Sequence, residues 1–244
     1  MDEIDVSVVL PVLNAEASLP SCLDSLIAQR GIRLEIIAVY SASRDRTLEI
    51  LQSNGTSLRL LFSDEPGVYP AMNRGLQEAR GRWLYFIGAD DRLVAPDVFA
   101  RLLASAGEDA DLLSGAIRYV NRTHYLVPEV HESRFGGGLR WRNTLHHQGC
   151  LYRRRVFEEG IFDTRYKILA DYDLNIRLWK KGCRAVETGI MMAECEAGGL
   201  SKQFGGALYR EELALKRQGL NVWEYALNAV WVRLKWLVKG YGWA

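Results

Sequence analysis

Two adjacent aspartates end an apolar run in the segment FIGADD, residues 86–91. Neighbouring carboxylates repel each other, and burial of either without a counter-charge costs free energy. A cation held by Asp90 and Asp91 would offset both costs, and oxygen ligands suit magnesium or manganese. A turn or a helix cap is the structural alternative, because aspartate before an apolar segment is common in both. The pair is therefore a candidate site for a divalent cation.

Three other polar segments follow apolar runs in the same way. They are PVLN at 11–14, YSASRD at 40–45 and DEPGVYPAMNRG at 64–75. In an open α/β sheet the carboxyl ends of parallel strands meet at one edge, and ligands bind beyond that edge. We therefore expect these segments and the aspartate pair to converge into one binding site.

The elements that must position these segments alternate along the first hundred residues, as in βα units around a sheet. The apolar runs predict strands at 6–10, 34–39, 58–62, 83–88, 111–120, 124–130 and 150–154. The helical spacing predicts helices at 19–27, 43–54 and 70–80, and a further one with Pro96 in its first turn. Residues 134–141, RFGGGLRW, are expected to form a mobile loop. The fold class predicted is α/β, with a mostly parallel central sheet flanked by helices.

Composition restricts the class of protein. The chain has 244 residues, 48% hydrophobic and 25% charged, with 31 basic against 30 acidic residues. Such a balance is typical of an ordinary globular protein and gives no overall attraction to nucleic acid. The four cysteines show no CxxC pairing, and we expect them to be reduced. The acidic start and the lack of a stretch of about 18 apolar residues predict a protein that is neither secreted nor integral to a membrane, hence cytoplasmic.

The last forty residues differ from the rest. On a helical wheel from residue 222, apolar residues cover one broad face: Val222, Trp223, Ala226, Leu227, Val230, Trp231, Leu234 and Val238. The narrow polar stripe contains Glu224, Asn228, Lys235 and Lys239. A basic, tryptophan-bearing amphipathic helix is typical of a membrane surface. Packing on the domain or against a second copy in a homodimer is the alternative, and the pattern alone does not decide between them.

Three longer segments together resemble family 2 glycosyltransferases of the GT-A fold, the inverting enzymes that assemble bacterial surface polysaccharides. They are SVVLPVLNAEASLPSCLDSL, GVYPAMNRGLQEARGRWLYFIGADD and HHQGCLYRRRVFEEGIFDTRYKILADYDLNIRLWKKG, in that order. The resemblance covers about residues 5–200. It implies a glycosyltransferase domain at 1–200, with a nucleotide-binding part at about 1–110 and an acceptor part at about 111–200. Residues 201–244 would then form a basic, amphipathic helical extension.

By this resemblance Asp90 and Asp91 match the Asp-x-Asp type motif, whose carboxylates hold manganese or magnesium against the diphosphate of a sugar nucleotide. The metal would spread the charge that develops on the leaving diphosphate. A carboxylate must also take the proton of the acceptor hydroxyl, and LADYDL places Asp171 at the position of that base. Ala170 stands where the family usually has glutamate. Asp173 is the second candidate, and a simple helix cap is the structural alternative for Asp171.

Donor recognition is where the sequence departs from the family. Family members usually carry an aspartate after the second strand that binds uracil, and here Tyr40 and Ser41 replace it. Either Tyr40 stacks on the base and Ser41 is a weaker acceptor, or the base is not uracil. The other residues that the resemblance assigns to donor binding are Pro11, Asn14, Ser43, Asn73, Arg74, Asp90 and His147. His147 and Gln148 would lie near the diphosphate or the acceptor, and GGLS at 198–201 resembles a phosphate-binding turn.

The sequence thus predicts an enzyme that moves a sugar from a nucleoside diphosphate sugar, with UDP favoured, to a glycan or polyprenyl-linked acceptor at the inner face of the cytoplasmic membrane. Two alternatives stay open. A nucleotidyltransferase of related fold would need a glycine-rich, lysine-containing loop after the first strand, and PVLNAEAS has neither residue. A nucleotide-sugar-binding module without turnover is compatible with the altered YSAS segment.

Overall fold

The computed structural model describes residues 3–122, 127–158, 161–198 and 205–240, and for 238–240 it describes the backbone alone. The strands are β1 (Val6–Val12), β2 (Leu34–Tyr40), β3 (Arg59–Phe62), β4 (Trp83–Phe86), β5 (Arg92–Leu93), β6 (Leu112–Val120), β7 (Val130–Glu132), β8 (Cys150–Arg153) and β9 (Ala185–Glu196). The α-helices are α1 (Leu19–Ile27), α2 (Thr47–Ser53), α3 (Val68–Glu78), α4 (Val98–Ala104), α5 (Ala170–Lys180), α6 (Gly206–Gly219) and α7 (Val222–Gly240). Short 3-10 turns η1 (Gly137–Arg140), η2 (His147–Gly149) and η3 (Arg154–Phe157) complete the chain.

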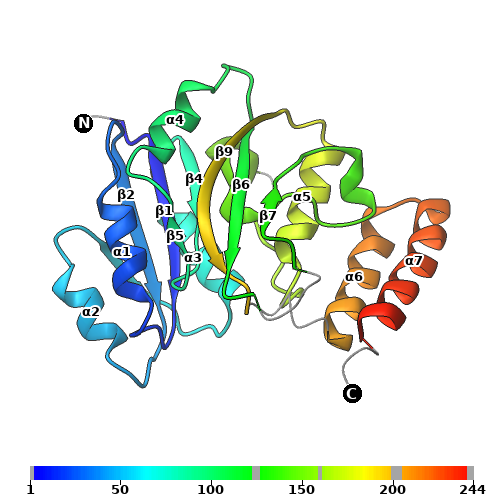
Figure 1. Ribbon diagram of the computed structural model, residues 1–244, viewed down its shortest axis with the longest axis horizontal. Helices are drawn as coiled ribbons and strands as arrows, with labels where there is room; N and C mark the ends of the chain where they lie inside the picture. The colour runs from blue at the N-terminus through cyan, green and yellow to red at the C-terminus, as the bar shows by residue number, and fades with distance from the viewer. Residues whose placement is uncertain (1–2, 123–126, 159–160, 199–204, 241–244) are drawn as a thin grey trace.

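All the strands belong to one sheet with the order β3-β2-β1-β4-β8-β6-β9-β5, and β7 pairs with β6. The first four strands of this order are parallel, since β1 pairs with β2 and β4 and β2 pairs with β3. Beyond β4 the sheet is mixed: β8 is antiparallel to β4 and β6, whereas β6 and β9 are parallel. The sheet curls through the middle of the molecule with helices on both sides (Figure 1). The α/β class is confirmed, and the parallel part is the amino-terminal half.

Two hydrophobic cores cover the two faces of the sheet. One contains the buried sides of α1 and α4, represented by Leu23 and Phe99. The other contains the buried sides of α3, α5 and α6, represented by Met72 and Leu174. β1 supplies both cores because its residues, apart from the buried Ser7, are apolar without alternation, as expected for a strand buried on both faces. Gly75 lets α3 approach β1 closely, since a Cβ there would lie 2.4 Å from Cγ1 of Val9.

Some predicted boundaries are wrong. α3 begins at Val68, because Gly67 with φ of 120° turns the chain directly into the helix, and it ends at Glu78 rather than Arg80. Pro96 precedes α4 instead of lying in its first turn. Within the segment 134–141, which is predicted to be a loop, the short turn η1 forms around the buried Leu139. Of the strand predicted at 124–130, Val130 opens β7, and residues 123–126 lie outside the described residues.

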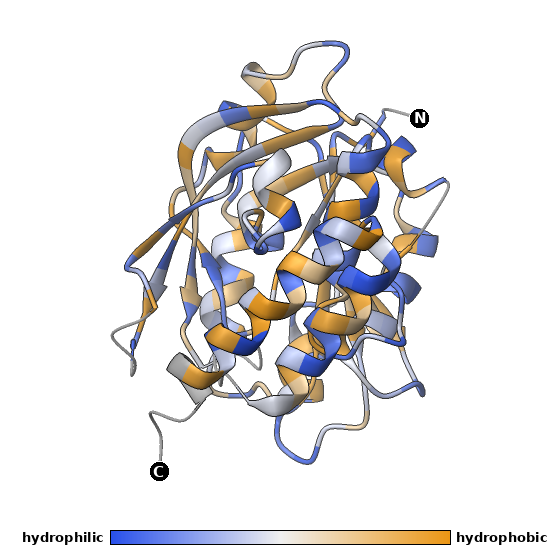
Figure 2. Cartoon of the chain, turned by 90° about the vertical axis from the view of Figure 1, so that its right-hand side faces the viewer, coloured by the Kyte–Doolittle hydropathy of each residue, from blue (hydrophilic) through white to orange (hydrophobic). Residues whose placement is uncertain are grey.

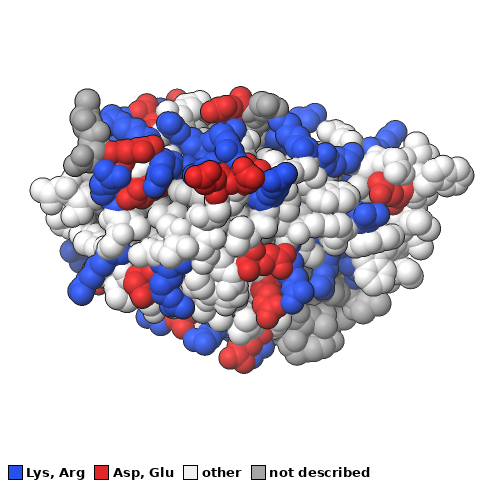
Figure 3. Space-filling view, turned by 90° about the horizontal axis from the view of Figure 1, so that it is seen from above, with Lys and Arg blue, Asp and Glu red and all other residues white. Residues whose placement is uncertain are grey.

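The edge at the amino ends of the strands carries paired charges. Asp5 accepts hydrogen bonds from Arg33 and Arg82, and Asp111 accepts one from Arg155. Figure 3 views the molecule from this side and shows basic and acidic side chains intermixed. Exposed pairs of this kind contribute little to stability. This face therefore shows no large area of one charge.

α3 is held to the segment before α5 by one buried side chain. Asn73 is 7% exposed, its Nδ2 donates to the carbonyl of Phe162 at 2.8 Å, and its Oδ1 accepts from the Phe162 N–H at 3.1 Å. Both polar groups of the Phe162 backbone are satisfied by this one amide. Asn73 is therefore a structural clamp, and the donor contact that the sequence predicts for it stays a prediction.

The two C-terminal helices form an antiparallel pair beside α5, at the right of Figure 1. Their contact is polar at its centre. The Lys216 ammonium is fully buried and donates to Oε1 of Glu212, Oδ1 of Asn228 and the carbonyl of Trp141, each at 2.8 Å. Lys235 of α7 also pairs with Glu212. Burial lowers the pKa of Lys216 to about 8, and Glu212 opposes that shift.

The polar side of the amphipathic helix α7 faces the rest of the protein. Asn228 is fully buried, and Glu224 lies against Arg140. The apolar residues point outward: Val222, Trp223, Leu227, Val230, Trp231, Leu234, Trp236 and Leu237 are each at least 42% exposed. Figure 2 faces this side of the molecule, where orange segments follow the helix that leads to the C-terminus. Within the part of the chain that the structure describes, the apolar face of α7 is therefore largely exposed. The boundary between a 1–200 domain and its extension stays a prediction.

We expect Glu212→Gln to lower the free energy of unfolding by about 3 to 5 kcal/mol, because it leaves the buried ammonium of Lys216 and the partly buried ammonium of Lys235 without a counter-charge. Arg217→Gln is the matched control, since Arg217 is the exposed neighbour of Lys216 and should change stability by about 0.5 kcal/mol or less. Equilibrium unfolding in urea measures both variants. Equal values for the two would contradict the buried ion cluster.

Asn73→Ala should cost about 2 to 4 kcal/mol of unfolding free energy, because the N–H and the carbonyl of Phe162 then lose their buried partners. The neighbouring Arg74→Ala removes an exposed pair with Glu78 and should cost about 1 kcal/mol or less. The same urea titration compares them. If Asn73→Ala weakens nucleotide binding and leaves stability unchanged, the clamp is wrong and the predicted donor contact is right.

Candidate active site

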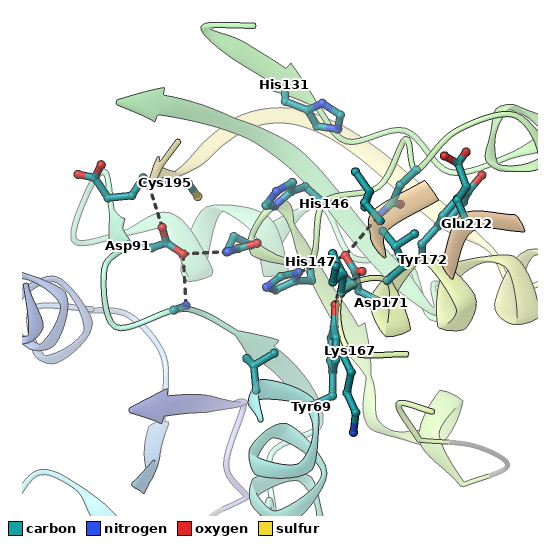
Figure 4. A pocket seen from close by; sticks show the side chains of 18 of the residues that line it. Tyr69, Asp91, His131, His146, His147, Lys167, Asp171, Tyr172, Cys195 and Glu212 are labelled. Atoms are coloured by element: carbon teal, nitrogen blue, oxygen red, sulfur yellow. Dashed lines mark hydrogen bonds and ion pairs between the residues drawn. The ribbon is translucent and has the colours of Figure 1, made fainter. Parts of the chain in front are cut away.

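A pocket of about 400 Å³ opens at the carboxyl ends of the central strands. Its wall combines segments that are far apart in the sequence: α3, the turn after β4, the segment 142–148, the start of α5, the end of β9 and the α6–α7 pair. Asp90, Asp91, His147 and Asp171 all line it. Figure 4 shows the last three of these around the pocket. The aspartate pair and the candidate base thus border one pocket together with α3, whereas the PVLN and YSASRD segments, which were expected to converge with the pair, do not line it.

Asp91 is the structural member of the aspartate pair. Its carboxylate is 4% exposed and accepts hydrogen bonds from Nε2 of Gln148 at 2.8 Å, the N–H of Glu196 at 3.1 Å and the N–H of Gly88 at 3.3 Å (Figure 4). Burial and the neighbouring charge of Asp90 raise its pKa to about 6, against the effect of these hydrogen bonds. Asp91 thus ties the end of β4 to η2 and to the end of β9.

Asp90 is the accessible member of the pair. Its side chain is exposed and has no hydrogen-bond or ion-pair partner within the described ranges. Its Oδ1 and the Oδ2 of Asp91 converge over Gly88, where an added Cβ would lie 2.6 Å from the first atom and 3.0 Å from the second. Glycine at position 88 therefore keeps open a small space that two carboxylate oxygens share.

Asp171 lies in the first turn of α5, where the helix N-terminus stabilises negative charge. It is 7% exposed. The hydroxyl of Tyr69 lies 3.1 Å from its Oδ1, and Nδ2 of Asn143 and Nδ1 of His147 lie 3.2 Å and 3.3 Å from its Oδ2 (Figure 4). Burial raises the pKa of this carboxyl, but the bonds from His147 and Tyr69 outweigh burial and hold the pKa below its usual value. Asp171 is therefore ionised at neutral pH.

Asp173, the second candidate for the base, faces elsewhere. Its carboxylate pairs with Arg177 at 2.8 Å and does not line the pocket. Burial raises its pKa, with Arg177 acting in the opposite direction. The two aspartates thus have different surroundings, and only Asp171 has access to a substrate in the pocket.

His147 contacts the candidate base rather than either aspartate of the pair. Besides its contact with Asp171, its ring stacks on that of His146 with centroids 5.4 Å apart. Gln148 connects to the other side through its bond to Asp91, and its Oε1 has no partner within the ranges that the structure describes. The HHQG segment therefore lies between the two groups of carboxylates.

The residues predicted to bind the nucleotide gather beside this pocket, at the ends of β1 and β2. Asn14, with φ of 48°, donates its N–H to Oγ of Ser43 at 3.1 Å and accepts at Oδ1 from the N–H of Arg44 at 2.8 Å. The N–H of Ser41 donates to the carbonyl of Val12 at 3.2 Å. These bonds join the PVLN and YSASRD segments into one surface.

The other donor candidates fall into two groups. Pro11 pairs with Val39 inside the parallel sheet, and the Tyr40 ring packs edge-on against Phe62 with centroids 5.6 Å apart, so both border this surface. Arg74 lies outside it and pairs with Glu78 on its own helix, and Asn73 is occupied as the clamp described above. The structure thus joins Pro11, Asn14, Tyr40, Ser41 and Ser43 and separates Asn73 and Arg74 from them.

Several residues of the pocket were not singled out as site residues from the sequence: Tyr69, Arg142, Asn143, Tyr209 and Glu212. Tyr69 lies within the GVYPAMN segment, which the sequence already placed at the expected binding site. The others come from the irregular segment after β7 and from the C-terminal helices, where no spacing rule points to a site. Of the predicted GGLS turn, residues 199–201 lie outside the described residues.

The described residues offer neither a further metal site nor a membrane-spanning helix. They contain no group of three or more His, Cys, Asp or Glu side chains arranged to hold a metal ion. None of the helices in that part of the chain has the length and apolar character needed to cross a membrane.

Comparison with known proteins identifies the family. Residues 7–162 match the family described as glycosyl transferase family 2. A PGL/p-HBAD biosynthesis glycosyltransferase of Mycobacterium bovis is 38% identical over 183 residues, which cover 70% of this chain and 68% of that protein.

Solved structures share the fold. S. aureus TarS matches with a TM-score of 0.69 at 20% identity over 87% of this chain, which spans only 39% of the TarS chain. The mannosyltransferase PcManGT from Pyrobaculum calidifontis, in complex with GDP-Man and Mn²⁺, matches with a TM-score of 0.60 at 21% identity over 98% of this chain and 82% of that one. At these identities the likeness supports the GT-A fold alone. Taken with the family match and the Mycobacterium relative, it shows that this chain belongs to glycosyl transferase family 2 and is a glycosyltransferase.

Proposed function

We propose that this glycosyltransferase is an inverting, divalent-cation-dependent enzyme that moves a sugar from a nucleoside diphosphate sugar to a hydroxyl of a glycan or lipid-linked acceptor. The assembly of a surface polysaccharide, such as O-antigen, capsule or exopolysaccharide, is the process that we infer for it. The observation that carries the proposal is the placement of two separate carboxylate groups in one pocket. Asp90 and Asp91 stand at one side of it, and an ionised Asp171 stands at another.

The aspartate pair fits a divalent cation. Asp90 offers an exposed carboxylate, and an Asp91 oxygen shares the space over Gly88 with it. The buried and unpartnered Oε1 of Gln148 is a further hard oxygen in the same pocket. Asp90, with Asp91 beside it, would hold manganese or magnesium, which in such sites neutralises charge on a leaving diphosphate. PcManGT binds Mn²⁺ together with GDP-Man, which supports this choice.

Asp171 is suited to be the general base. Its low pKa keeps the carboxylate ready to accept a proton from an acceptor hydroxyl, while the attacking oxygen approaches the anomeric carbon opposite the leaving group. Burial raises the pKa of Tyr69, so this hydroxyl stays protonated, and its one hydrogen is shared between the carbonyl of Ile168 at 2.8 Å and Oδ1 of Asp171 at 3.1 Å. His147 and Asn143 bind the other oxygen. These side chains hold the ionised carboxylate in place. The function that we propose for it is to accept a proton.

The surface formed by Asn14, Tyr40, Ser41 and Ser43 would bind the base and ribose of the donor. TarS has been solved with UDP, and PcManGT with GDP-Man, so relatives of this fold use both bases. We favour UDP, although Ser41 in place of an aspartate offers a weaker acceptor to uracil. His147 contacts Asp171 and would reach the donor only through its remaining ring nitrogen.

We propose that the enzyme works at the inner face of the cytoplasmic membrane and that α7 rests on the lipid surface. The apolar side of α7 points outward with three exposed tryptophans, and Arg233 is exposed beside them. In Figure 3 the tip of the right-hand end of the molecule, where α7 lies, is white, with some basic and acidic atoms beside it. Such a face suits the boundary between lipid headgroups and acyl chains.

Replacement of the base tests the proposed reaction. With Mn²⁺ present, hydrolysis of a panel of UDP and GDP sugars should fall by a factor of about 10² to 10⁴ in Asp171→Asn, because the amide cannot accept the proton. UDP affinity, measured by calorimetry, should stay within about threefold of the wild type, since the base contributes to the transition state.

Asp173→Asn is the matched control and should retain turnover within about threefold, because Asp173 lies outside the pocket. Metal-dependent turnover that survives in Asp171→Asn but is lost in Asp173→Asn would reverse the assignment. Absence of turnover with every donor in the presence of bound UDP would instead favour a binding module.

The membrane proposal predicts that the wild type sediments with vesicles of phosphatidylcholine and phosphatidylglycerol. Combined Trp223→Ser, Leu227→Ser and Leu234→Ser should weaken this binding at least about tenfold, because three exposed apolar side chains are lost from the lipid-facing side. All three are exposed, so the helix should still pack through Asn228 and Val232.

A matched control makes three equivalent changes at exposed apolar positions elsewhere: Ile27→Ser, Leu48→Ser and Val94→Ser. It should bind vesicles like the wild type. If the wild type stays in the supernatant, or if both triple variants bind equally, the apolar face of α7 belongs to a dimer contact instead.

A further inference from the structure

A second groove lies between the segment 134–144 and α7, and we name it the aromatic groove. Its apolar surface comes from Phe135, Trp141 and Trp231, and Gly136–Gly138 form its backbone wall. Trp141 is 41% exposed and Trp231 is 47% exposed. An added Cβ at Gly136 would meet no atom within 4 Å, so this wall is open. The groove therefore presents accessible indole surface that the fold itself does not use.

Most polar groups of the aromatic groove already have partners in the chain. Arg134 pairs with Glu132 at 2.7 Å, Glu187 accepts the N–H of Phe135 at 3.1 Å, and the Thr144 hydroxyl donates to the carbonyl of Arg134 at 2.8 Å. Arg142 differs, because its guanidinium is exposed and has no ion pair or side-chain hydrogen bond in the part of the chain that the structure describes. Among the described residues the groove thus offers apolar aromatic surface, the unpaired guanidinium of Arg142 and the exposed carboxylate of Glu187, which is bound by a backbone N–H and by no cation.

Arg142 lines both the aromatic groove and the pocket that contains Asp171. It therefore stands where a ligand would pass from one to the other. On the far side of the groove, Trp231 belongs to the outward apolar face of α7, with Val230 and Leu234 as its neighbours. The order along this path is a carboxylate-lined pocket, a single guanidinium, an aromatic groove and an apolar helix face.

We propose that this path binds an acceptor built in the same order: a sugar in the pocket, a phosphate linkage at Arg142 and an isoprenoid chain in the aromatic groove. This inference rests on the proposed function and narrows its acceptor to lipid-phosphate-linked sugars. Guanidinium groups recognise phosphate oxygens through paired N–H donors. Flat indole surfaces remove the apolar chain from water, and α7 contributes one wall of the acceptor site.

Farnesyl phosphate is a soluble probe for this path, and calorimetry measures its binding below its micelle concentration in the presence of saturating UDP and Mn²⁺. The wild type should bind it at least about tenfold more tightly than farnesol or inorganic phosphate, because each of these carries only one of the two recognised groups. Arg142→Gln should weaken the binding of farnesyl phosphate about tenfold and leave farnesol unaffected. Combined Trp141→Ala and Trp231→Ala should weaken both prenyl probes about tenfold.

Arg233→Gln and Trp223→Ala are the matched controls, since both residues are exposed on α7 and line neither the pocket nor the groove. They should bind farnesyl phosphate within about twofold of the wild type. Thermal melting of every variant shows whether it is folded. The assignment is overturned if farnesol binds as well as farnesyl phosphate, if the controls lose as much binding as Arg142→Gln, or if UDP displaces the probe.

Donor hydrolysis in the same preparation separates this inference from the proposed function. Metal-dependent hydrolysis of a nucleotide sugar without Arg142-dependent binding of farnesyl phosphate refutes the acceptor path and leaves the proposed function standing. Binding of the probe that depends on Arg142, in a protein that hydrolyses no donor, supports the path and counts against the proposed reaction.

Discussion

The buried carboxylate of Asp91 connects the two halves of this glycosyltransferase. One half is the parallel sheet that ends at Gly88, and the other supplies Gln148 and the backbone of Glu196. A carboxylate that is buried beside a second one is disfavoured in its charged form, and the pKa of about 6 reflects that cost. The three hydrogen bonds retain it there. The position of Asp90, the opening of the pocket and the approach of the HHQG segment all depend on this link.

The pocket separates two kinds of carboxylate by their surroundings. Asp90 and Asp91 share one space and destabilise each other's charge, which is the arrangement that a divalent cation relieves. Asp171 has three donors and a helix N-terminus, so it carries its charge without a cation. One group is thus suited to hold a positive ion and the other to accept a proton. Environment alone makes this distinction, since all three residues are aspartates.

The sequence predicted those elements whose burial follows from the apolar pattern of their own residues. Continuous apolar runs predicted the strands of the parallel half. The LADYDL segment offered Asp171 and Asp173 as candidates for the base, and the contact of Asp173 with Arg177 distinguishes the two. The sequence did not reveal the clamp role of Asn73, because an amide that bonds a distant backbone has no local pattern. Asn143, Arg142 and Glu212 reach the pocket only through the pairing of β6, β8 and β9 and the packing of α6 on α5. Long-range contacts of this kind are set by tertiary structure and not by spacing.

The central claim is that Asp90 and Asp91 hold a divalent cation against a nucleoside diphosphate while Asp171 stays free of both. A crystal structure with UDP and Mn²⁺, with data collected at the manganese absorption edge, tests it most directly. The account predicts an anomalous peak within coordination distance of Asp90 and of the diphosphate, with Asp171 bound to neither. A peak at Asp171 or His147, or diphosphate bound far from Asp90, would contradict it.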